Sequence, residues 1–186
     1  MADLSAPMKP LVSVVGNSGV GKTTFLERLI RELKTRGYRV ATIKHDVHTF
    51  EIDHPGKDSW RLAKAGSDIV VISGSSKLAL IERVRQERAL TDVVAMISDR
   101  VDIVLTEGYR GASAMKIEVS RSEHSHVLTA RLDDLIAIVT DERFDYPVPQ
   151  FDLGDGPGVA DLLEGRFALR SPHSAPGVKA CGSDAE

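Results

Sequence analysis

The 186-residue sequence contains a single cysteine, Cys181, which excludes an intrachain disulfide and a zinc cluster built from thiolates. Long apolar runs are also missing, because none exceeds five residues, whereas a membrane-spanning helix needs about 20. Residues 1–10 lack the apolar stretch of a signal peptide. These absences predict a cytoplasmic protein without a membrane segment.

An excess of positive charge is absent too. The chain carries 24 Lys and Arg against 27 Asp and Glu, which gives a formal net charge of −3. General nucleic-acid binding depends on a basic surface that releases counterions from phosphates, so we expect no nucleic-acid partner. A hydrophobic content of 42% and a charged content of 27% are typical of a globular protein.

The pattern along the chain favours one domain, residues 10–167, between a flexible N-terminus, residues 1–9, and a disordered tail, residues 168–186. Short β-branched runs alternate with helical stripes, which indicates an α/β fold with a mostly parallel sheet. The predicted strands are residues 11–15, 39–44, 68–73, 77–82, 102–106, 115–120 and 135–140. The predicted helices are residues 23–36, 58–65, 91–98 and 157–164, with Gly37 and Gly66 ending the first two and Asp58 capping the second.

A phosphate-binding motif lies between the first strand and the first helix. The segment matches G-x-x-x-x-G-K-[ST] at every fixed position, in the strand-to-helix context that the motif requires. Its glycines turn backbone N–H groups toward phosphates, Lys22 would reach the β and γ phosphates, and the Thr23 hydroxyl would bind Mg²⁺. The nucleotide-binding residues are therefore Gly16, Asn17, Ser18, Gly19, Val20, Gly21, Lys22 and Thr23. We predict the three-layer P-loop NTPase fold with extra strands.

A Mg²⁺ site needs a second anchor, and an acid at the end of a neighbouring strand commonly provides it. Glu107 ends the apolar run of residues 103–106, and Gly108 lets the chain turn sharply after it. Glu107 would hold the metal through water or polarise an attacking water; the alternative is an acid that only caps a loop. Asp102 begins the same strand, so we expect it at the opposite edge of the sheet.

The sequence indicates less directly which nucleotide base the site binds. The guanine-reading motif Asn-Lys-x-Asp is absent, because Asn17 in the phosphate loop is the only asparagine. A carboxylate can still accept hydrogen bonds from guanine N1 and N2. Asp141 follows the last predicted strand and is our candidate for this role, with a solvated turn acid as the alternative.

Ionisable side chains crowd the predicted loop after the second strand. They are His45, Asp46, His48, Glu51, Asp53, His54 and Asp58. Loops at the carboxyl ends of parallel strands form the ligand face of such sheets. This loop is therefore either a site for a substrate or partner with Asp46 near the Mg²⁺, a transition-metal site, or a solvated connection.

Two further groups of basic residues have less specific interpretations. His124 and His126 fall on one side of a predicted extended segment, and we expect them at the surface. Arg83, Arg85 and Arg88 could form a phosphate-transfer lid, although a solvated helix face is the favoured interpretation.

Several of these segments together resemble the molybdopterin-guanine dinucleotide biosynthesis protein B (MobB) family. They are the strand with GNSGVGKTT, the run TIKHDVH from Thr42, the segment DHPGKDSW from Asp53 with Ala65-Gly66 after it, and DIVLTEGY from Asp102. The resemblance covers about residues 10–167, and the proline-containing segment is more specific to the family than the phosphate loop.

The resemblance implies a homodimeric GTP-binding protein, a slow GTPase at most, that assists the molybdenum cofactor guanylyltransferase. A molybdopterin-type cofactor is a further candidate ligand. The resemblance extends the phosphate loop to Thr24 and makes Glu107 the metal-side acid, so that Lys22 and Glu107 are the catalytic candidates. Thr23, Glu107 and Asp46 are the candidate ligands of Mg²⁺.

Two other functions fit the phosphate loop alone. A small-molecule P-loop kinase would need a lid and an acceptor pocket, and residues 83–88 are the available lid candidate. A nucleotide-gated binding module would use the same phosphate site without turnover. The histidine-rich loop and residues 55–59 favour the accessory protein.

Overall fold

The computed structural model describes residues 9–45 and 50–170, which belong to two compact units. The first, which we call the sheet unit, contains residues 9–45 and 94–170. The second, which we call the hairpin unit, contains residues 50–93. Among the described residues, no helix is long and apolar enough to cross a membrane.

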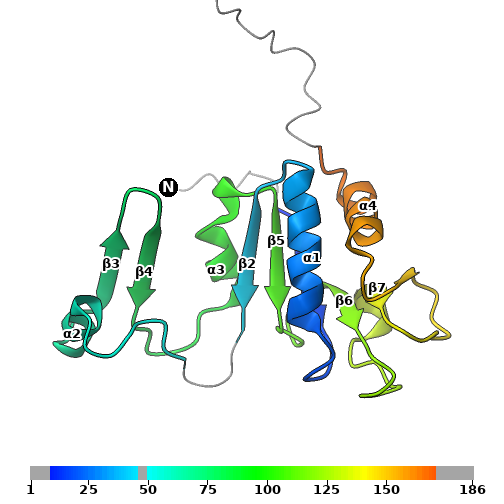
Figure 1. Cartoon of the computed structure of the whole chain (residues 1–186), viewed down its shortest axis with the longest axis horizontal. Helices are drawn as coiled ribbons and strands as arrows, with labels where there is room; N and C mark the ends of the chain where they lie inside the picture. The colour runs from blue at the N-terminus through cyan, green and yellow to red at the C-terminus, as the bar shows by residue number, and fades with distance from the viewer. Residues whose placement is uncertain (1–8, 46–49, 171–186) are drawn as a thin grey trace, which may run out of the picture. The chain divides into compact units, whose positions relative to one another are not determined.

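The sheet unit is built around a six-stranded sheet in the order β2-β5-β1-β6-β7-β8, and every neighbouring pair is parallel. The strands are β1 (Leu11–Val15), β2 (Val40–Lys44), β5 (Ile103–Glu107), β6 (Met115–Val119), β7 (Leu135–Val139) and β8 (Gln150–Phe151). Because they run the same way, their carboxyl ends meet at one edge, the lower edge of this unit in Figure 1. The predicted α/β fold with a mostly parallel sheet is confirmed, and β8 was not predicted.

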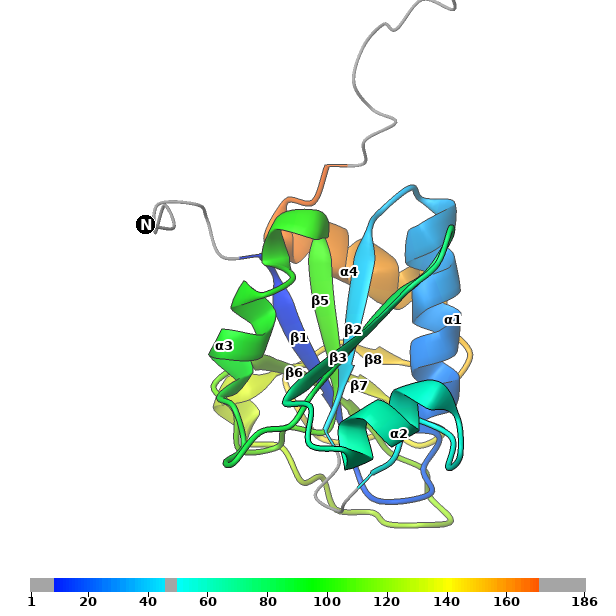
Figure 2. The same cartoon turned by 90° about the vertical axis from the view of Figure 1, so that its left-hand side faces the viewer.

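Two long helices pack on the sheet. They are α1 (Lys22–Thr35) and α4 (Gly156–Phe167). Helix α1 buries the stripe of Phe25, Leu26, Leu29 and Leu33 against alternate strand residues, and it lies to one side of the strands in Figure 2. Gly37, with a φ of 89°, follows the helix in the left-handed region as predicted.

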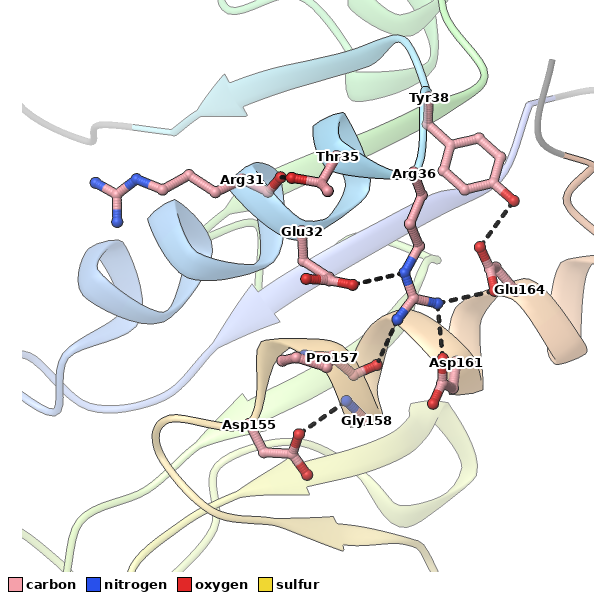
Figure 3. A network of polar contacts seen from close by, with 10 residues as sticks. All are labelled: Arg31, Glu32, Thr35, Arg36, Tyr38, Asp155, Pro157, Gly158, Asp161 and Glu164. Atoms are coloured by element: carbon pink, nitrogen blue, oxygen red, sulfur yellow. Dashed lines mark hydrogen bonds and ion pairs between the residues drawn. The ribbon is translucent and has the colours of Figure 1, made fainter. Parts of the chain in front are cut away.

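Helices α1 and α4 are joined by the polar network of Figure 3. The Arg36 guanidinium donates to Glu32 at 2.8 Å, Asp161 at 2.7 Å and Glu164 at 2.8 Å. The buried Tyr38 hydroxyl donates to the other oxygen of Glu164 at 2.9 Å. Burial and this carboxylate raise the pKa of Tyr38 to about 12. Arg36 therefore holds the carboxyl end of α1 against α4.

The hairpin unit contains α2 (Asp58–Lys64) and the antiparallel strands β3 (Ile69–Ser73) and β4 (Leu78–Glu82), which form a separate two-stranded sheet. Both strands were predicted from the sequence, at residues 68–73 and 77–82. Alternate residues face opposite sides of a sheet. Val70 and its partner Ile81 are on the side that, with Trp60 of α2, lines a cavity of about 530 Å³.

Three local expectations are corrected. Helix α2 has Lys57 at its N-cap position, and Asp58 lies in its first turn, where a carboxylate favours the helix dipole without capping it. The predicted helix 91–98 is instead α3 (Leu90–Ala95), which crosses the boundary between the units and is followed by a 3-10 helix, Ser98–Arg100. Leu169, assigned to the tail, packs against the core of the sheet unit.

Candidate functional site

The phosphate loop occupies the turn between β1 and α1. Gly16, Gly19 and Gly21 have φ values of 138°, 83° and 95°, which side-chain-bearing residues rarely adopt. A Cβ atom on Gly16 would lie 2.2 Å from the carbonyl oxygen of Val119, so the chain also needs glycine there for space. Gly21 is the N-cap of α1 and supplies no side-chain acceptor, which leaves the first-turn N–H groups for an anion.

Thr23 and Glu107 come together at this turn, as the sequence predicts. Strands β1 and β5 are neighbours, and Val14 pairs with Glu107, which sets the carboxylate beside the start of α1. The Thr23 hydroxyl donates to Glu107 Oε2 at 2.9 Å. Two oxygen ligands of this kind, completed by water and phosphate oxygens, fit the preference of Mg²⁺. The third predicted ligand, Asp46, lies outside the described residues.

Lys22 lies in a positively charged environment. Its ammonium donates to the carbonyl of Asn17 at 2.8 Å. Burial lowers the pKa of Lys22, the charges of Arg110 and Lys44 lower it further, and Glu107 opposes them. An anion beside Lys22 would relieve this repulsion, as a phosphate-binding site requires.

Arg110 and Lys44 were not identified from the sequence. Arg110 follows Glu107 by three residues, and its guanidinium donates to the carbonyl of Gly16. Lys44 ends β2 at the carboxyl edge of the sheet. The sequence held a signal for both residues. Arg110 is a basic residue shortly after a strand-end acid, and Lys44 is one at the end of a neighbouring strand.

The loop after β6 brings two more basic residues to the phosphate loop. His124 Cε1 lies 3.1 Å from the position that a Cβ atom on Gly19 would take. Arg121 Nη2 lies 3.6 Å from the corresponding position on Gly21. His124 and His126 are exposed, as predicted, but their segment forms turns and is not extended. The buried Nε of Arg121 has no hydrogen-bond partner among the described residues.

Asp141 follows β7 at the same edge of the sheet. Its Oδ1 accepts a hydrogen bond from the backbone N–H of Ser122 at 2.8 Å. This bond lowers the pKa of Asp141, so the side chain is a carboxylate at neutral pH. The reading of guanine by Asp141 stays a prediction.

The histidine-rich loop is divided between the two units. His45, in the sheet unit, stacks on Tyr109 with ring centroids 4.4 Å apart. The backbone N–H of His45 donates to the backbone carbonyl of Glu107 at 3.0 Å. Asp53, in the hairpin unit, accepts from Ser59 Oγ at 2.9 Å. His48 lies outside the described residues, and within the described ones no group of three or more His, Cys, Asp or Glu could hold a metal.

Two of the three arginines considered as a lid make contacts within the hairpin unit. Arg83 donates to the carbonyl of Ala63 at 2.9 Å, and Arg88 pairs with Glu82. Residues 83–88 form no helix, so the alternative of a solvated helix face is wrong.

Residues 11–141 match the family model described as Molybdopterin guanine dinucleotide synthesis protein B. The molybdopterin-guanine dinucleotide biosynthesis adapter protein of Haemophilus influenzae is 36% identical over 157 residues, which cover 83% of this chain and 88% of the relative. The corresponding protein of Escherichia coli is 33% identical over 162 residues, or 84% of this chain and 92% of the relative.

The solved structures agree with the sequence comparison. MobB of Bacillus subtilis matches with a TM-score of 0.69 at 28% identity, over 87% of this chain and 98% of that chain. A MobB homologue from Bacillus stearothermophilus matches with a TM-score of 0.63 at 27% identity, over 86% of this chain and 99% of that chain. The phosphate loop, the paired Thr23 and Glu107 and the parallel sheet thus occur in a chain that belongs to the MobB family.

Proposed function

We propose that this chain is a GTP-binding accessory protein of molybdenum cofactor biosynthesis that assists the guanylyltransferase joining GMP to molybdopterin. Membership of the MobB family and the two relatives named adapter proteins support the pathway. The observation that carries nucleotide binding is the hydrogen bond from Thr23 to Glu107 beside Lys22. Any hydrolysis of GTP at this site is slow, and a molybdopterin-type cofactor is a further ligand to test.

The residues divide the work of binding. The backbone N–H groups at the start of α1 receive the phosphates, and Lys22 exchanges the carbonyl of Asn17 for phosphate oxygens. Thr23 and Glu107 would hold Mg²⁺, which neutralises charge on the β and γ phosphates when bound. Val119 and Gly16 keep the loop close to β6.

The decisive test is Lys22→Ala. The substitution removes a charged donor to the β and γ phosphates, and such bonds contribute about 1.5–3 kcal/mol. We expect the Kd for Mg²⁺·GTP in calorimetry to rise about 10- to 150-fold, while the circular dichroism spectrum stays unchanged.

A matched control for this test is Lys77→Ala, which removes the same charge from an exposed position in the hairpin unit. It should leave the Kd for GTP unchanged. An unchanged Kd in Lys22→Ala would refute the nucleotide site. Phosphate transfer to an added small-molecule acceptor would instead support the kinase alternative.

Guanine specificity is the second part of the proposal. A carboxylate can accept from the N–H groups of guanine, whereas the N1 acceptor of adenine would face it repulsively. We expect displacement of labelled GTP to need at least about tenfold more ATP than unlabelled GTP. In Asp141→Ala, the difference in binding free energy between GTP and ATP should be smaller by about 1.4 kcal/mol. Equal displacement by the parental protein would refute guanine preference; an unaltered difference in Asp141→Ala would refute only this reader.

Homodimer formation is the third part, and the hairpin unit supports it. One face of β3 and β4 carries four exposed apolar side chains, which are Ile69, Val71, Leu78 and Leu80. A contiguous apolar face of this kind is typical of a surface that another chain covers. We infer that two copies of this chain meet through β3 and β4.

A further inference from the structure

Arg110 and Lys22 make the same kind of contact with the phosphate loop. The Lys22 ammonium donates to the carbonyl of Asn17, and the Arg110 guanidinium donates to the carbonyl of the adjacent Gly16. Lys22 reaches phosphate in its binding motif, so its carbonyl contact is a resting position. The parallel contact gives Arg110 the same kind of resting position on the preceding residue of the loop.

The backbone that precedes Arg110 is held in a specific shape. Gly108 has a φ of 94°, and its N–H donates to the carbonyl of Val14 at 3.1 Å. Tyr109 has a φ of 56°, which is unusual for a residue with a large side chain, and its ring stacks on His45. Such a conformation persists only where the surroundings specify it, and it is frequent at functional sites. Here it directs Arg110 at the phosphate loop.

The charges at this edge exceed what the loop alone can use. Around Lys22 itself, Lys44 and Arg110 add two further positive charges, and Glu107 contributes one negative charge. Lys22 and the helix N-terminus already contact the β phosphate, which a diphosphate and a triphosphate share, and Lys22 supplies only one ammonium to the γ phosphate. A further arginine is the residue that matches the additional oxygens of a terminal phosphate, because its planar fork can donate two bonds.

We propose that Arg110 contacts the terminal phosphate of a bound nucleoside triphosphate and so distinguishes it from the diphosphate. With a diphosphate bound, the guanidinium stays on the carbonyl of Gly16; with a triphosphate, it exchanges that carbonyl for γ-phosphate oxygens. This assignment rests on the proposed nucleotide site and adds a residue that the binding motif does not contain.

The test compares two ligands in one variant. In Arg110→Gln, we expect the Kd for Mg²⁺·GTP to rise about 10- to 100-fold and the Kd for Mg²⁺·GDP to change less than about threefold. Retained binding of GDP shows that the site is folded. Arg131→Gln, which removes the same charge from an exposed side chain, should change neither Kd.

A second variant tests the proposal in case Arg110→Gln does not fold. Arg110→Lys keeps a charged donor but loses the fork, and we expect a loss of GTP affinity smaller than that of Arg110→Gln, with GDP affinity unchanged. Equal effects on GTP and GDP, or no effect on either, would overturn the role of Arg110. If Lys22→Ala also left both affinities unchanged, the nucleotide site itself would be refuted, so the two failures are distinguishable.

Discussion

Gly16 combines a backbone angle and a close contact that a residue with a side chain cannot satisfy. Its φ is 138°, and a Cβ atom there would lie 2.2 Å from the carbonyl oxygen of Val119. We expect Gly16→Ala to lower the free energy of unfolding by about 2–4 kcal/mol in urea denaturation, because β1 and β6 must separate to admit the methyl group.

The control for this prediction is Gly165→Ala, in the interior of α4. Nothing lies within 4 Å of the Cβ position at Gly165, and alanine is the better helix former. This control should raise the free energy of unfolding by about 0.5–1 kcal/mol. Similar destabilisation by both substitutions would contradict the steric explanation at Gly16.

The Thr23 hydroxyl gives a prediction about metal dependence. If Thr23 and Glu107 hold Mg²⁺, Thr23→Ala should remove most of the gain in GTP affinity that Mg²⁺ provides over EDTA. Thr35→Ala, at the other end of α1, should keep the full gain, since its hydroxyl donates to the helix carbonyl of Arg31. A Mg²⁺ dependence that is the same in both variants would exclude Thr23 as a ligand.

Residues within a local motif were predictable, and residues brought in by loops were not. The phosphate loop and Glu107 are specified by short-range spacing, and Asp102 could be placed at the opposite edge because strand direction is set by the α/β pattern. Arg110, Arg121 and His124 reach the site through turns, one of which depends on the positive φ of Tyr109. No periodicity encodes that conformation.

At the scale of elements, Asp102 joins the amino ends of β2 and β5. Its carboxylate accepts from the backbone N–H of Arg39 at 2.8 Å and from the guanidinium at 3.2 and 2.7 Å. These contacts with Arg39 lower the pKa of Asp102 below its ordinary value of 3.8. The stability that they contribute is therefore present above about pH 3.8 and is lost as the pH falls through the lower folded-state pKa.

We expect Asp102→Asn to unfold at lower urea concentration at pH 7, with a loss of about 1 kcal/mol because the partner Arg39 is half-exposed. The difference from the parental protein should shrink as the pH falls below about 3.8 and vanish once the pH is below the lowered folded-state pKa. Asp99→Asn, at an exposed position, should show no difference at either pH. A gap that persists at low pH would argue against the ion pair as its cause.

Element identity was more predictable than element pairing. Strands such as β1 and β7 are short runs rich in β-branched residues, and their sequence suffices to identify them. Strand β8 has only two residues, which is too short for a strand pattern to be recognised in the sequence. Strands β3 and β4 were predicted individually, but whether they join the main sheet depends on long-range pairing that residue spacing does not encode.

At the scale of the whole molecule, the proposed dimer can be separated from nucleotide binding. Val71 and Leu80 are directly paired and exposed on one face of the hairpin unit. We expect Val71→Lys with Leu80→Lys to convert a dimer into a monomer in light scattering after gel filtration, because two charges would be buried at the interface. The Kd for GTP should change less than about threefold.

Val127→Lys provides the control, because Val127 is also exposed but belongs to the sheet unit. It should leave the oligomeric state unchanged. A double variant that remained dimeric would place the contact between copies on another surface. The division into two units was not predicted, since residues 10–167 read as one alternating pattern in the sequence.

The contacts of Lys22 and Arg110 with carbonyl groups also bear on how a nucleotide leaves. When a phosphate that they contact leaves, each of these cations can again donate to a backbone carbonyl of the phosphate loop. Binding and release thus exchange one set of acceptors for another, and the net change in hydrogen bonds is small. For GDP, with the Arg110 guanidinium still on the carbonyl of Gly16, Lys22 makes this exchange, and we expect a rapid off-rate of GDP without an exchange factor.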